Sequence, residues 1–90
     1  MDIISPEAKL FTGEVESLTL PGTHGSFLLL ENHAPIVSTL QGGAVKIKGN
    51  ITIAESVQNQ FESISKEETL FTISSGTIEM RDNKIILLSD

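Results

Sequence analysis

Residues 20 to 35 read Leu-Pro-Gly-Thr-His-Gly-Ser-Phe-Leu-Leu-Leu-Glu-Asn-His-Ala-Pro and hold two of the three prolines of the chain. Pro21-Gly22 predicts the centre of a type II turn, because proline fixes φ and glycine accepts a positive φ. The apolar run at residues 27–30 predicts a strand covered on both faces. Ala34-Pro35 keeps the backbone extended. The stretch therefore predicts a turn, a buried strand and a polar bend made of Glu31, Asn32 and His33.

Short strand-like segments bounded by turn residues continue on both sides of this stretch. Residues 44–48 alternate, so we expect Val45 and Ile47 to point inward and the two lysines between and after them to point outward. Asp82-Asn83 predicts a two-residue hairpin turn of the primed type. The other expected strands are residues 2–5, 10–12, 14–20, 36–40, 51–53, 69–74, 77–81 and 85–88. This spacing predicts an all-β fold, an antiparallel sandwich or barrel.

Residues 54–65 fit two different structures. Ala54, Val57, Phe61 and Ile64 are spaced like one face of a helix. The segment is nevertheless rich in polar residues and lies between two strand-like runs. We therefore favour a long hairpin with its turn near residues 57–60, and keep the helix as the alternative.

Length and charge bound the possible functions. Ninety residues predict a single domain covering residues 1–90. The net charge is −6 and the six basic residues are scattered, which argues against nucleic acid and against an anionic membrane surface as partners. No apolar run approaches the ~20 residues that span a bilayer, and the N-terminus lacks the pattern of a signal peptide. We expect a protein on the cytoplasmic side with no membrane insertion.

The sequence contains no motif of a catalytic, cofactor or metal site. The chain has no cysteine, and its only histidines are His24 and His33, too few for a zinc site. No phosphate-binding glycine loop occurs, and no motif places a serine, a histidine and an acid together. We predict no catalytic residue, no cofactor and no metal, and the two histidines are most simply loop residues exposed to solvent.

A series of short motifs resembles the epsilon subunit of F-type ATP synthases over nearly the whole chain. The motifs are Ser5-Pro6-Glu7, Leu10-Phe11-Thr12-Gly13-Glu14-Val15, Leu20-Pro21-Gly22-Thr23, His33-Ala34-Pro35, Ser74-Ser75-Gly76-Thr77-Ile78-Glu79-Met80 and Asn83-Lys84-Ile85-Ile86-Leu87-Leu88. Each motif alone is weak, and their order and spacing together are specific. The resemblance implies a flattened barrel of about ten short strands, in agreement with the strand pattern.

The resemblance also implies a function without chemistry. Epsilon subunits are non-catalytic parts of the central stalk that bind the gamma subunit and the c-subunit ring, and so couple ion-driven rotation to ATP synthesis. The implied location is the cytoplasmic face of the bacterial inner membrane, as a peripheral part of the ATP synthase complex. The implied partner-binding residues are Thr23, His24 and Ser26, facing the c ring, and Glu31, Asn32 and His33, near gamma.

The sequence departs from the family pattern at three places. Glu31-Asn32 stands where the family usually has Pro-Gly, Ser26 stands where a glutamate is common, and residues 49–68 are longer than usual. The chain stops at Asp90, so we expect no C-terminal helical hairpin and no inhibition through one.

Two other classes of protein are weighed against this one. A biotinyl or lipoyl carrier domain is also a small acidic sandwich, but it needs a lysine at a hairpin tip, and Lys46 and Lys48 are expected within a strand. A small ligand-binding module, such as a jelly-roll enzyme or sugar binder, needs aromatic side chains or paired carboxylates. The chain has four phenylalanines and no tryptophan or tyrosine, which argues against it.

Overall fold

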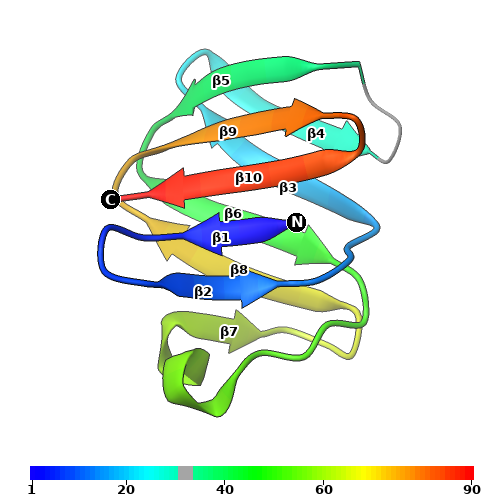
Figure 1. The fold of residues 1–90 in the computed structure, drawn as a ribbon, viewed down its shortest axis with the longest axis vertical. Coiled ribbons are helices and arrows are strands. Elements are labelled where there is room, and N and C mark those ends of the chain that lie inside the picture. The colour runs from blue at the N-terminus through cyan, green and yellow to red at the C-terminus, as the bar shows by residue number, and fades with distance from the viewer. Residues whose placement is uncertain (31–33) are drawn as a thin grey trace.

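The computed structural model describes residues 1–30 and 34–90, and strands make up most of these residues (Figure 1). The elements in chain order are β1 (Asp2–Ile4), β2 (Lys9–Thr12), β3 (Ser17–Gly22), β4 (Gly25–Leu30), β5 (Ile36–Leu40), β6 (Gly43–Lys48), the 3₁₀ helix η1 (Glu55–Gln60), β7 (Phe61–Ser63), β8 (Glu68–Ile73), β9 (Gly76–Arg81) and β10 (Lys84–Ser89). The strands average five to six residues in a small domain, as alternating sequences with frequent turn residues predict.

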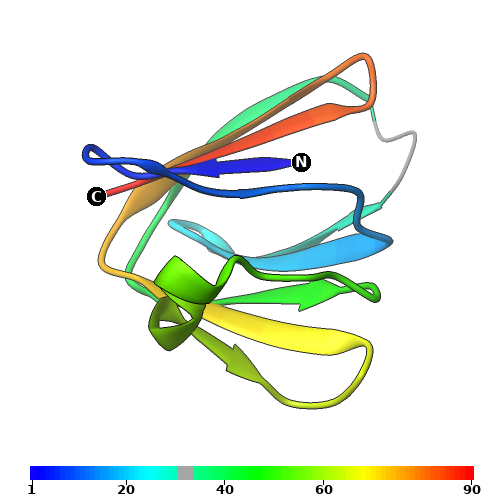
Figure 2. The same ribbon diagram turned by 60° about the horizontal axis from the view of Figure 1, so that its bottom comes forward.

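The strands form one sheet that curls into two facing layers (Figure 2). One layer has the order β2-β1-β10-β9-β5, and the other has the order β4-β3-β6-β8-β7. The layers join where β3 meets β5, through the single residue pair Gly22 and Leu40. Among the described residues this architecture confirms the expected β-sandwich, or flattened barrel, of about ten short strands.

One strand pair departs from the antiparallel expectation. β1 runs parallel to β10, with Ile3 opposite Leu87, and both side chains are fully buried. The remaining strand pairs that the structure describes are antiparallel. The N-terminal strand thus completes a layer whose other members come from the second half of the chain.

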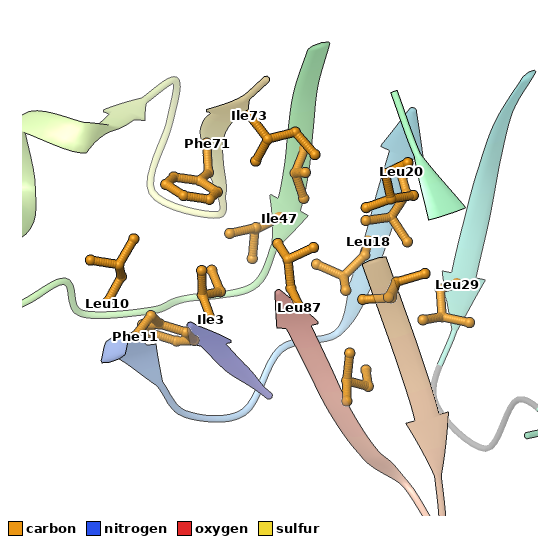
Figure 3. Close-up of a cluster of buried hydrophobic side chains, with 14 of the residues drawn as sticks. Ile3, Leu10, Phe11, Leu18, Leu20, Leu29, Ile47, Phe71, Ile73 and Leu87 are labelled. Carbon is orange, nitrogen blue, oxygen red and sulfur yellow. The ribbon is translucent and has the colours of Figure 1, made fainter. Parts of the chain in front are cut away.

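The core lies between the two layers and consists of aliphatic side chains with two phenylalanines (Figure 3). Its members are Ile3, Leu10, Phe11, Leu18, Leu20, Leu29, Leu40, Val45, Ile47, Phe71, Ile73, Ile78, Met80, Ile85 and Leu87. They come from both layers and mostly from alternate strand positions, because successive side chains of a strand point to opposite faces. Leu10 and Phe11 are the exception: they are adjacent in β2 and both buried, where the pairing with β1 is irregular. Burial of each such side chain contributes about 1.5–3 kcal/mol, which is what a core with few aromatic residues depends on.

Two local predictions are confirmed. In β6, Val45 and Ile47 are fully buried and the lysines are exposed. At the β9–β10 turn, Asp82 and Asn83 have positive φ values of 52° and 62°, as a primed turn requires.

The predicted turn at Pro21-Gly22 is wrong by two residues. Both residues belong to β3, and Thr23-His24 connects β3 to β4. Gly22 is needed there for space rather than for a positive φ: a Cβ on it would lie 2.7 Å from the Gly25 carbonyl oxygen and 2.9 Å from the Phe27 ring. The positive φ, 122°, is at Gly25. The sequence pattern correctly indicated a turn near these residues, but it assigned the turn to Pro21-Gly22 instead of Thr23-His24.

The prediction that residues 27–30 are covered on both faces is also wrong. Leu29 points into the core and is 1% exposed, whereas Leu28 and Leu30 are 53% and 50% exposed. β4 belongs to a layer that the other layer covers on one side only, so every second residue of the apolar run faces outward.

Residues 49–67 differ from both the favoured and the alternative expectation. Residues 51–53 form no strand, and the favoured turn at 57–60 is instead part of the 3₁₀ helix η1. The hairpin that does form joins β7 to β8 through residues 64–67. Four apolar side chains of this segment pack against the core: Ile51, Ile53, Val57 and Phe61. The Phe61 ring stacks on the Phe71 ring, with the ring centroids 4.8 Å apart. Of the four residues with helical spacing, only Val57 and Phe61 pack against the core, whereas Ala54 and Ile64 are exposed.

Candidate partner-binding site at the ends of β4

The β3–β4 hairpin tip is fixed to its neighbours by hydrogen bonds. The Thr23 amide donates to the Thr39 carbonyl oxygen at 3.3 Å, and the two threonine hydroxyls lie 3.1 Å apart. The Gln41 amide donates to the Pro21 carbonyl oxygen at 2.8 Å. These bonds attach the tip to β5 and to the residue that follows it, so the tip is held by β5 in addition to its own two strands.

Pro21 suits this corner because proline has no N–H to donate. β3 pairs with β6 through residues 17–19 and with β5 through Gly22. Pro21 lies between these two ladders, where the strand changes neighbours, and its carbonyl oxygen is the group that is used. The sequence thus builds a stiff hairpin at the point where the sheet folds over.

Thr23, His24 and Ser26 lie together on this tip and are all exposed. Ser26 is opposite Pro21 in the ladder, next to the two turn residues. The group offers two hydroxyls and an imidazole to a partner, with no acid beside them in the hairpin. Such a surface can form hydrogen bonds and has no arrangement suited to nucleophilic or acid–base chemistry.

The other predicted site residues, Glu31, Asn32 and His33, lie outside the described residues. Their described neighbours are Leu30, which ends β4, and Ala34, which precedes β5. The hairpin tip is at the opposite end of β4, and six extended residues span roughly 20 Å. β4 therefore separates the hairpin tip from Leu30, the last described residue before Glu31 in the sequence.

A hollow of about 630 Å³ opens between the layers, away from the hairpin tip. Its floor includes Leu29, Met80 and Ile85, and its rim includes Glu14 and Glu16.

Within residues 1–30 and 34–90 no group of three or more histidine, cysteine or acidic side chains is placed to hold a metal ion. In the same residues no helix is long and apolar enough to cross a membrane.

Sequence reasoning missed the exposed apolar side chains of the surface. Leu28 and Leu30 of β4 and Val37 of β5, the last 71% exposed, lie on the outer faces of the layers. The run at residues 27–30 looked like a core strand because its inward and outward positions are both apolar. Only the position of β4 in its layer shows which of these apolar residues point inward and which point outward.

Comparison with known proteins identifies the family. The model of the family "ATP synthase, Delta/Epsilon chain, beta-sandwich domain" matches residues 1–90. The chain belongs to this family. It is similar to the ATP synthase epsilon chain of Leptospira borgpetersenii, with 37% identity over 90 residues, and to that of Chlorobaculum tepidum, with 33% identity over 91 residues. All of the chain is covered in both, with 59% of the Leptospira protein and 86% of the Chlorobaculum protein.

A solved structure shows the same fold. A chain in the central stalk and c-ring structure of the Tetrahymena thermophila mitochondrial ATP synthase matches with a TM-score of 0.73 and 13% identity. The match covers 98% of this chain and 60% of the other. Membership of the ATP synthase family thus rests on sequence, and the agreement of the two folds extends over almost the whole sandwich.

Proposed function

We propose that the chain is a non-catalytic, rotor-coupling subunit of an ATP synthase, which binds the gamma subunit and the c-subunit ring. In this function it transmits ion-driven rotation of the ring toward ATP synthesis and acts as a peripheral component on the cytoplasmic face of the bacterial inner membrane. The single observation that supports this most is the family match over all 90 residues.

The geometry supports a part that transmits force rather than one that performs a reaction. The hairpin tip is bonded to β5 through Thr23 and Thr39, and its base is part of the sheet. The tip lies at one end of β4, and Leu30, which precedes residues 31–33 in the sequence, lies at the other. We infer two contact regions: the tip for the c ring, and residues 31–33 for gamma. A rigid sandwich that holds two contacts apart can pass torque from one partner to the other.

The carrier-domain alternative is not supported. Lys46 and Lys48 lie within β6, which pairs with β3 and β8, and not at a hairpin tip. Lys46 also pairs with Glu68 at 2.7 Å. A lysine modified by biotin or lipoate must reach a distant active site, and these two positions project from the middle of a sheet.

The first test is assembly with gamma and the c ring from the same organism. Co-expression should give a complex that contains this chain in fixed stoichiometry after size-exclusion chromatography. Separate elution of the chain from gamma and from the ring at micromolar concentration would overturn the proposal.

The second test separates the two contact regions. The triple variant Thr23→Ala, His24→Ala, Ser26→Ala should weaken binding to the c ring by about tenfold or more and leave gamma binding unchanged. The double variant Glu31→Ala, His33→Ala should do the reverse. Loss of the same partner in both variants would contradict the assignment of one region to each partner.

A further inference from the structure

Within the described residues, three strands of the curled sheet pair on one side only. They are β2, β7 and β4, whose single described partners are β1, β8 and β3. An edge strand presents unpaired N–H and C=O groups that can pair with another chain, and natural proteins protect such edges with charges, prolines, bulges or short strands.

Two of the three edges have this protection. β2 begins with Lys9, and its pairing with β1 shifts register between Ile3 and Ile4. β7 has only three residues, and the middle one is Glu62. A further strand would meet a charged side chain at either edge. It would also have to pair with an irregular strand at β2 or with a very short strand at β7.

The β4 edge has none of these features. All six of its residues pair with β3 in unbroken register, from Gly25 opposite Gly22 to Leu30 opposite Ser17. They are Gly-Ser-Phe-Leu-Leu-Leu, without a charge or a proline. Alternate residues of an antiparallel strand point their backbone groups away from the partner, and among the described residues β4 pairs with β3 alone.

The outer surface beside this edge is a hollow that has leucines at the edge and charged side chains further in, among them Lys46, Lys48, Glu67 and Glu68. Leu28 and Leu30 are half-exposed and lie next to the small side chains of Thr19 and Ser17. Lys46 and Lys48 lie one strand further in, on β6. A strand added to β4 would therefore lie beside the two leucines, while the lysines of β6 lie across β3 in the same hollow.

We propose that the free edge of β4 accepts an extended segment of another ATP synthase subunit as an additional strand, with an apolar side chain beside Leu28. The unpaired backbone groups require an extended peptide, and the leucines require apolar side chains at alternate positions. The source of the segment rests on the proposed function, since that function places the chain among other subunits.

A second copy of the chain fits this edge less well. Two six-residue strands pair along only about 20 Å, with their backbones about 5 Å apart. Such a pair alone buries much less surface than the ~800 Å² per partner of a stable interface. A subunit already held by other contacts in the same complex needs no such area, because its segment binds at high effective concentration.

Hydrogen exchange tests the backbone pairing directly. ATP synthase particles from the same organism are stripped of this chain and then reassembled with it. The amides of alternate residues within 25–30 that point away from β3 should exchange at least about tenfold more slowly in the reassembled particles than in the free chain. Residues 61–63 of β7, on a protected edge, should not change.

Variants test the edge independently. Leu28→Lys introduces the charge that protects the other edges, and should weaken rebinding to stripped particles by about tenfold or more, while Leu28→Val, which stays apolar and suits a strand, should retain binding. Leu88→Lys is the matched control: Leu88 is 48% exposed but lies on β10, which is paired on both sides, so rebinding should be unchanged. Circular dichroism checks the fold of each variant.

The outcomes are distinguishable. Rebinding without added protection of β4, or with normal affinity for Leu28→Lys, overturns strand addition and leaves the proposed function standing. Failure of the unaltered chain to rebind overturns both. Protection of residues 25–30 that rises with the concentration of the free chain alone assigns the edge to a second copy and overturns the proposed occupant.

Discussion

At the scale of single residues, Gly22 matters for the space that it leaves free. It ends β3 directly below the hairpin tip, where the Gly25 carbonyl and the Phe27 ring approach it closely. Its conformation is not the reason, because the positive φ of this hairpin is at Gly25. A backbone carbonyl at 2.7 Å cannot rotate away as a flexible side chain could.

Gly22→Ala should therefore destabilise the chain by about 1–3 kcal/mol, since the added methyl group forces the two strands of the hairpin apart. Chemical denaturation measures the change. Ser26→Ala, in the same hairpin but exposed, should stay within about 0.5 kcal/mol. Equal stability of Gly22→Ala and the unaltered chain would show that the hairpin can relax without cost.

Asp2 shows how a single hydroxyl sets a pKa. The Thr12 hydroxyl donates to the Asp2 carboxylate at 2.6 Å, and this bond, with smaller contributions from Lys9 and the N-terminal ammonium, holds the pKa of Asp2 below its ordinary value of 3.8. Because the folded pKa is the lower one, the stabilisation is present above the unfolded pKa and is lost as the pH falls through the folded pKa.

Thr12→Val should raise the pKa of Asp2 toward its ordinary value, since the hydrogen bond that favours the charged carboxylate is gone. A carboxyl titration by NMR measures the shift. The unfolding free energy of the variant should also fall less between pH 5 and pH 2 than that of the unaltered chain. Thr72→Val, an equivalent change at an exposed position of β8, should alter neither quantity; an unchanged Asp2 pKa in Thr12→Val would contradict the assignment.

At the scale of elements, the β9–β10 hairpin depends on its two turn residues. Asp82 and Asn83 both adopt the left-handed conformation, which costs ordinary residues about 1–2 kcal/mol each and costs Asp, Asn and Gly less. The two strands that it joins include the buried Ile78, Met80 and Leu87.

Asp82→Ala should therefore lower the free energy of unfolding by about 1 kcal/mol, whereas Asp82→Gly should be neutral or slightly stabilising. Thermal or denaturant unfolding measures both. If alanine and glycine behave alike at this position, the loss comes from the aspartate side chain rather than from the backbone conformation.

At the scale of the whole molecule, the N-terminal strand closes a layer by pairing in parallel with the C-terminal strand. Ile3 and Leu87 face each other in this pair and are completely buried. Successive side chains of β1 point to opposite faces of the sheet, so Ile3 lies in the core and Ile4 is half-exposed on the outer face. The first strand is thus part of the core despite its three residues.

Ile3→Ala should lower the free energy of unfolding by about 2–4 kcal/mol because it leaves a cavity between the layers. For a domain of this size that is a large share of the total stability. Ile4→Ala, its outward neighbour, should cost about 1 kcal/mol or less. Similar losses for the two variants in denaturant unfolding would contradict the inward position of Ile3.

The alternating and turn-forming residues of the sequence by themselves determined the class of fold, most strand positions, the inward residues of β6 and the primed turn at Asp82-Asn83. These are local properties: they depend on side-chain alternation and on the φ values that particular residues accept. The site residues on the hairpin tip were predicted from the resemblance to family motifs. Their hydroxyl and imidazole groups form no sequence pattern that would predict a site without that resemblance.

Only the tertiary structure decided what depends on which strands are neighbours. It placed Pro21-Gly22 inside β3, put the hairpin tip and Leu30 at opposite ends of β4, turned Leu28 and Leu30 outward, and paired β1 with β10. An apolar run has the same sequence whether one face or both are covered, and a strand has the same sequence at an edge or in the middle. The physical reason is that burial and pairing belong to contacts between distant segments, which no local pattern of residues contains.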